Sequence, residues 1–170
     1  MSKKLKYLII HCSATPEGRY FDKQDILDWH CSPKPKGRGW RKPGYTDLIL
    51  LDGTLQNLTP FDQDDEVDGF EVTNGVRGIN SISRHICYIG GMDKNNEHPE
   101  DTRTTQQRDT LTTYVKYMVI RHPDIIIAGH NQFSSKACPS FDVPEYLDYC
   151  FTIPEKNICL LYTSPSPRDS

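Results

Sequence analysis

The chain lacks the features that mark membrane-spanning, exported and nucleic-acid-coating proteins. Its first apolar run, LKYLII, is too short to cross a bilayer, and the N-terminus has no long apolar stretch followed by small residues at a cleavage site. A net charge of -3 over 170 residues offers no basic excess for a phosphate backbone. We therefore expect no membrane partner, no nucleic-acid partner and a cytoplasmic location without a signal peptide.

Internal repeats and closely spaced cysteine pairs are missing as well. The chain has six cysteines but no Cys-x-x-Cys pair, which disfavours a closed structural zinc site. With 36% hydrophobic and 25% charged residues, a chain of this size can build its core without disulfides. The composition predicts one globular domain with reduced thiols, and we expect it to be a monomer.

The end of the chain, CLLYTSPSPRDS, differs in character from the rest. It resembles a translated sequencing adaptor, which would make residues from about Cys159 onward an artefact rather than native protein. The alternative is a disordered tail rich in serine and proline, and both interpretations predict no packed structure. We assign residues 1–153 to the folded domain, residues 154–170 to a non-native or disordered tail, and residues 159–170 to the adaptor-like part.

Apolar runs predict several strands. LKYLII predicts a strand that ends at His11, and LILL predicts a second strand that leads into the turn Asp52-Gly53 and a further strand. RHICYIGGM predicts a strand buried on both faces, and DIIIAGH predicts a strand that ends at His130.

Helical spacing and capping residues predict three helices. The first covers about residues 23–31 behind an Asp22 cap. The longest lies in DTRTTQQRDTLTTYVKYMVIRHP, where Asp101 or Thr102 can cap the start and Pro123 ends the helix. A short helix follows near Pro144. The order of elements predicts an α/β fold with a single mixed central β-sheet flanked by helices.

Two of the predicted strands end in a histidine, and a cysteine follows the second histidine by eight residues. Strand ends are where ligands and catalytic groups collect in α/β folds. His11, His130 and Cys138 can together form a zinc site of two imidazoles and one thiolate, with a fourth position left for water. From these residues alone the alternative stays open that both histidines are ordinary core or surface residues.

Five blocks in order carry a resemblance to a known family: IIHCSAT, WHCSPKPKGRGWRKPGYTDLILLDG, NSISRHICYIGGMD, DTRTTQQRDTL and AGHNQFSSKACPSFDV. Over residues 7–143 the chain resembles the type 2 N-acetylmuramoyl-L-alanine amidases, the superfamily that includes phage lysozyme-type amidases and peptidoglycan recognition proteins. The resemblance implies that residues 1–153 are a zinc amidase domain of that fold. It also implies that His11, His130 and Cys138 bind Zn²⁺.

The same resemblance matches Tyr45 and Lys136 to residues that assist the reaction. A lysine beside the metal can stabilise an oxyanion, and the tyrosine can act as a base or donate a hydrogen bond. Without the resemblance, both would be ordinary loop or strand residues. His30 is expected to have a supporting role rather than to bind the metal, and the remaining three histidines are expected on the surface: His85, His98 and His122. The loop with Lys34, Lys36 and Arg38 is expected to be a solvated charged loop.

The resemblance implies cleavage of the amide between N-acetylmuramic acid and L-alanine in peptidoglycan. The absence of an export signal favours a phage or prophage endolysin that reaches the wall after host lysis or release, and a bacterial wall-remodelling enzyme is the alternative. A recognition module that binds peptidoglycan without cleaving it is the main competing function. Loss of the cysteine ligand is the usual route to such a module, so the presence of Cys138 favours an enzyme.

Overall fold

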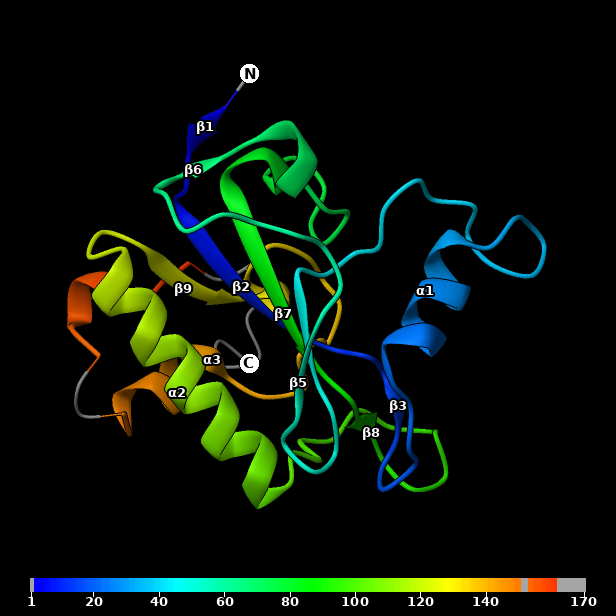
Figure 1. Ribbon diagram of the computed structural model, residues 1–170. Coiled ribbons are helices and arrows are strands. Elements are labelled where there is room, and N and C mark those ends of the chain that lie inside the picture. The colour runs from blue at the N-terminus through cyan, green and yellow to red at the C-terminus, as the bar shows by residue number, and fades with distance from the viewer. Residues whose placement is uncertain (1, 151–152, 162–170) are drawn as a thin grey trace.

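A mixed five-stranded β-sheet forms the centre of the protein, which we describe from a computed structural model over residues 2–150 and 153–161 (Figure 1). The strand order is β5-β4-β7-β2-β9. Four strands run parallel, and the edge strand β5 pairs antiparallel with β4 through the predicted Asp52-Gly53 turn. The strands are β2 (Tyr7–Cys12), β4 (Asp47–Ile49), β5 (Leu55–Asn57), β7 (Ser83–Tyr88) and β9 (Ile126–Gly129). The predicted fold class is confirmed.

Two small two-stranded sheets stand beside the central one. They pair β1 (Lys3–Lys4) with β6 (Glu66–Val67) and β3 (Thr15–Pro16) with β8 (Gly91–Met92). The described residues also form four short 3-10 helices: η1 (Gly69–Glu71), η2 (Asn80–Ile82), η3 (His130–Gln132) and η4 (Glu155–Asn157).

Over the ranges that the structure describes, three α-helices flank the sheet: α1 (Lys23–Cys31), α2 (Thr105–Arg121) and α3 (Val143–Asp148). Asp22 caps α1 as predicted. The cap of α2 is Thr104, whose Oγ1 accepts a hydrogen bond from the Gln107 N–H at 3.0 Å, so the predicted caps Asp101 and Thr102 are wrong. Both alternatives have other partners, because Asp101 pairs with two arginines and the Thr102 hydroxyl accepts the Gly91 N–H.

The helices cover opposite faces of the sheet (Figure 1). The main core joins α2 and α3 to alternate strand residues such as Ile10 and Ile86, whereas α1 packs through Ile26 against Leu48 and Cys87. Since side chains alternate along a strand, the residues next to Ile10 face the α1 side. This alternation places His11 on the α1 side of the sheet.

Residues 154–161 of the predicted tail contact the rest of the protein, although the side chains of Leu160 and Leu161 are exposed, contrary to the expectation of no packed structure. The Cys159 N–H donates to the Ile127 carbonyl oxygen at 3.0 Å, and the buried Asn157 side chain donates to the Pro123 and Ile125 carbonyl oxygens. These bonds extend the hydrogen-bonded edge at β9, which composition alone does not reveal. The rest of the predicted tail, residues 162–170, lies outside the described residues.

His122 is also buried, although the sequence placed it on the surface. Its Nδ1 lies 2.6 Å from Asp65 Oδ1 and its Nε2 lies 3.3 Å from the Arg84 guanidinium. Arg84 in turn forms a buried ion pair with Glu71 at 2.9 Å. Within the described part of the chain, no helix combines the length and apolar character that crossing a membrane requires.

Candidate metal centre

The pairing of β2 with β9 brings two of the predicted ligands together. Ile10 is opposite Gly129 in this parallel ladder, so the next residues, His11 and His130, lie side by side. Their ring centroids are 4.8 Å apart. Strand register alone therefore brings together two residues that are more than one hundred positions apart in the sequence.

Cys138 completes the group from the loop that follows η3. Its Sγ lies 3.7 Å from His11 Nδ1, and one ligand atom from each of His11, His130 and Cys138 lies within 4.8 Å of the others. Bond lengths of about 2.0–2.3 Å around a tetrahedral zinc ion place its ligand atoms roughly 3.3–3.8 Å apart. The spacing and the chemistry of these donors fit one metal ion.

Burial keeps both histidines in the neutral form that can bind a metal. Burial, with a smaller contribution from Lys136, lowers the pKa of His130 to about 4. Burial also lowers the pKa of His11 well below its ordinary value, and the neighbouring histidines add to the effect. Both imidazoles are therefore neutral at pH 7, the form that offers a lone pair to a metal. Contact with the Cys12 thiol and burial raise the pKa of Cys138 well above its ordinary value, although the Cys12 N–H donates to Cys138 Sγ at 3.2 Å, so the thiol gives up its proton only when a metal binds.

A cavity of about 370 Å³ opens beside the three residues, and the predicted catalytic residues Tyr45 and Lys136 both line it. The Tyr45 ring packs between two imidazoles, with centroid distances of 5.0 Å to His11 and 5.4 Å to His30. Burial raises the pKa of Tyr45 well above its ordinary value, so the phenol keeps its proton at neutral pH. The exposed Lys136 lies close enough to lower the pKa of His130.

The charged groups around this cavity have one sign. Arg38, Arg77 and Lys136 line it, and no carboxylate does so among the described residues. Arg38, predicted to be part of a solvated loop, is exposed but stacks on the Trp40 ring at 4.9 Å and thereby reaches the cavity. The arrangement suits an anionic ligand.

His30 supports the wall of this cavity. Its Nδ1 accepts a hydrogen bond from the Gly44 N–H at 3.0 Å, next to Tyr45. It is not among the residues whose ligand atoms converge, which agrees with the predicted supporting role.

Sequence reasoning missed His85, which it placed on the surface. The side chain is completely buried, and its Nδ1 lies 2.9 Å from His11 Nε2. The available signal was its position two residues before Cys87 in a buried strand, which puts both side chains on the same face. His98 is exposed, as predicted.

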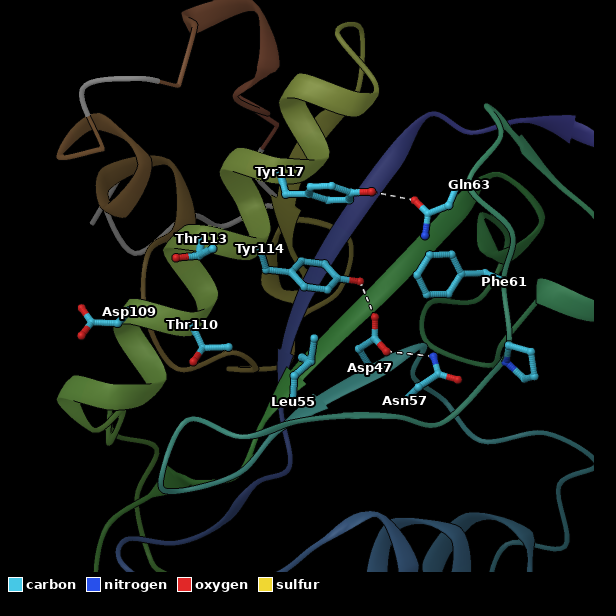
Figure 2. A pocket seen from close by; sticks show the side chains of 11 residues that line it. Asp47, Leu55, Asn57, Phe61, Gln63, Asp109, Thr110, Thr113, Tyr114 and Tyr117 are labelled. Atoms are coloured by element: carbon cyan, nitrogen blue, oxygen red, sulfur yellow. Dashed lines mark hydrogen bonds between the residues drawn. The ribbon is translucent and has the colours of Figure 1, made fainter.

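A second pocket, of about 860 Å³, lies on the α2 side of the sheet edge (Figure 2). Its buried carboxylate, Asp47, accepts hydrogen bonds from the Tyr114 hydroxyl at 2.6 Å and from the Asn57 amide at 2.9 Å. Tyr117 donates to Gln63 at its mouth. No histidine or cysteine lines this pocket among the described residues, so it offers no comparable metal site.

A metal centre with two imidazoles, one thiolate and an adjoining cavity is the kind that metal-assisted hydrolases use. The chain belongs to the N-acetylmuramoyl-L-alanine amidase family, because that family's model matches residues 1–141. It is accordingly an amidohydrolase, as the sequence predicted.

Individual relatives agree with this family. The chain is 33% identical to the endolysin of Enterobacteria phage K11, over 81% of this chain and 82% of the relative. It is 31% identical to the endolysin of Klebsiella phage KP32, over 82% and 83% of the two chains. Its fold matches the amidase LysC from Clostridium intestinale URNW with a TM-score of 0.65 at 21% identity, covering 89% of this chain and 87% of LysC.

Proposed function

We propose that the chain is a zinc-dependent amidase that hydrolyses the bond between N-acetylmuramic acid and L-alanine in peptidoglycan. The observation that carries the proposal is the convergence of His11, His130 and Cys138 within 4.8 Å, beside a cavity that Lys136 lines. Zinc, when bound there, would supply a Lewis acid and a water nucleophile that is active near neutral pH.

Lys136 is proposed to stabilise the negative charge that develops on the substrate carbonyl oxygen. Its ammonium group belongs to the cavity wall and has no ion-pair partner among the described residues, so its charge is available to a substrate. A preorganised cation at such a position lowers the barrier because it needs no rearrangement during the reaction.

Tyr45 is proposed to donate a hydrogen bond in the same cavity. Its ring is held between the rings of His11 and His30, which restricts where the hydroxyl can point. A protonated phenol in this position can orient the attacking water or contact the tetrahedral intermediate, and the leaving amine then takes its proton from water. No covalent enzyme intermediate is required.

The cationic rim favours a substrate with carboxylates. Arg38 and Arg77 line the same cavity as Lys136, and the peptide stems of peptidoglycan carry free carboxylates. We propose that these arginines orient the stem, that the protein acts as a monomer, and that it is a phage or prophage endolysin. Support for the last point comes from the identity to endolysins of two phages.

The test measures zinc content and the release of stem peptides from purified peptidoglycan together. We expect the full chain to hold about one zinc and to release peptides that begin with L-alanine, whereas Cys138→Ser should do neither. Cys150→Ser, which removes a half-buried thiol outside the centre, is the matched control and should do both. If the full chain binds zinc and peptidoglycan but releases no peptide, it is a recognition module and the proposal is wrong.

A further inference from the structure

His85 lies directly behind a proposed metal ligand. In the parallel ladder of β2 and β7, Ile9 is opposite His85 and His11 is opposite Cys87. The two histidines are therefore diagonal neighbours on the same face of the sheet, and their facing nitrogens, His11 Nε2 and His85 Nδ1, are 2.9 Å apart. This distance is that of a hydrogen bond.

The two nitrogens of the His11 ring face different partners. Nδ1 lies on the side of Cys138 Sγ, at 3.7 Å, while Nε2 faces His85. A metal held with Cys138 therefore takes Nδ1. A neutral imidazole that uses Nδ1 as a ligand carries its proton on Nε2, so His11 donates and His85 Nδ1 accepts.

The His85 side chain makes no other hydrogen bond within the described structure. It is absent from the converging metal-ligand group, and its remaining ring nitrogen, Nε2, is buried without a hydrogen-bond partner among the described residues. Its backbone N–H donates to the Thr46 hydroxyl at 3.1 Å, which anchors the strand beneath the ring. The ring's one hydrogen bond in the described part of the chain therefore goes to His11.

A glycine provides the space that His85 occupies. Any Cβ atom added at position 75 would overlap Nδ1 and other atoms of the His85 ring. Gly75 also lines the metal-side cavity. The ring can face His11 only while position 75 has no side chain.

We propose that His85 is a positioning residue that holds the His11 ring for metal binding, and that Gly75 is required because it makes room for the His85 ring. The inference rests on the proposed function in one respect, namely that His11 binds the metal through Nδ1. Residues that orient a metal-bound histidine typically change metal affinity by about 10- to 100-fold when they are replaced.

The first experiment compares His85→Leu with His85→Asn by competition for zinc against a chelator. Leucine fills most of the space but accepts no hydrogen bond, so we expect zinc to bind about 10- to 100-fold more weakly. Asparagine keeps an acceptor oxygen near the position of Nδ1 and should restore most of the affinity. Visible absorption of the cobalt-substituted proteins reports the ligand geometry directly, and it should change in the leucine variant only.

The second experiment moves the His85 ring without replacing it. Gly75→Ala should weaken zinc binding in the parent protein, because the new methyl group displaces the ring. The same change should have no further effect in a His85→Ala background, where no ring remains to be displaced. Comparing Gly75→Ala in the two backgrounds separates the effect of ring position on zinc binding from the effect of a general loss of stability.

The control for removing a buried histidine is His122→Leu, since His122 contacts Arg84 and Asp65 rather than the centre. It should lower the melting temperature and leave zinc affinity unchanged. Parent-like zinc affinity in His85→Leu would overturn the positioning role while leaving the proposed function intact. Failure of the parent itself to bind zinc would overturn both.

Discussion

The metal-side pocket and the pocket on the α2 side of the sheet contrast in size and in chemistry. The metal-side pocket has a volume of about 370 Å³ and the other about 860 Å³. In the larger pocket the buried carboxylate of Asp47 is occupied by hydrogen bonds from Tyr114 and Asn57 (Figure 2). Beside the smaller one, which His11 and His130 line, the ligand atoms of His11, His130 and Cys138 face one another.

This difference identifies which polar groups are available for chemistry. A buried polar group that is satisfied by its neighbours stabilises the fold and gains little from a ligand. The converging lone pairs of two neutral imidazoles and a sulfur make only weak contacts with one another, such as the 3.7 Å contact of His11 Nδ1 with Cys138 Sγ, and a cation between them interacts more strongly with all three. Convergence of ligand atoms, rather than volume, therefore marks the reactive side of this sheet.

The largest effect within this comparison is expected from Lys136→Ala. Removing a cation that stabilises an oxyanion should lower kcat by about 100- to 1,000-fold while zinc content stays at the parent level. Lys94→Ala, at another exposed lysine, is the control and should leave kcat unchanged. Loss of zinc together with activity in the Lys136 variant would contradict the assigned role, because it would make the lysine part of metal binding.

A smaller effect, on stability alone, is expected from Tyr114→Phe on the opposite side. The change removes the hydroxyl that donates to the buried Asp47 carboxylate and should cost about 1–3 kcal/mol of unfolding free energy. Urea unfolding measures this loss, and kcat and zinc affinity should not change. Tyr117→Phe, whose hydroxyl contacts the exposed Gln63, should stay within about 0.5 kcal/mol. Loss of activity in the Tyr114 variant would show that the two pockets are coupled.

The pH dependence of the unfolding free energy, measured with a chelator present to remove any metal, is a further test of the metal-side pocket. Burial lowers the pKa of His85 to about 3, whereas an unfolded histidine titrates near pH 6.5. The unfolded chain therefore binds more protons between these values, so stability that is present above pH 6.5 is lost as the pH falls. The slope from one such histidine is at most about 1.4 kcal/mol per pH unit.

Unfolding at a series of pH values, in the parent and in His85→Asn, checks this prediction. The variant should show a shallower loss of stability between pH 6 and about 4, because it lacks one buried imidazole. His98→Asn removes an exposed histidine and should reproduce the parent's profile. An unchanged slope in the His85 variant would mean that the ring is hydrated in solution.

Local patterns in the sequence determined most elements of this fold. Asp22 was identified as a helix cap because its side chain can accept backbone N–H groups of the following turn, and this interaction requires only neighbouring residues. The strand that carries His11 and the strand that leads into His130 were predicted from short apolar runs that end in a polar residue. The family blocks then linked these histidines to Cys138 and, as a proposal, to Tyr45 and Lys136.

The sequence was less informative wherever a residue's role depends on distant partners. Thr104 caps α2, whereas Thr102 accepts a hydrogen bond from Gly91 in β8 and Asp101 pairs with the nearby Arg103 and Arg108. The sequence around His85 and His122 does not show that either side chain has a hydrogen-bond partner inside the protein.

The chain alone thus determined the strands of the central sheet and the three α-helices, which follow from periodicity and capping, and the family blocks singled out the three residues that converge. Only the tertiary structure decided the register of β2 between β7 and β9, because register depends on packing of whole strands. That register sets His11 between His130 and His85, and it explains why the converging ligand atoms lie on one face of the sheet.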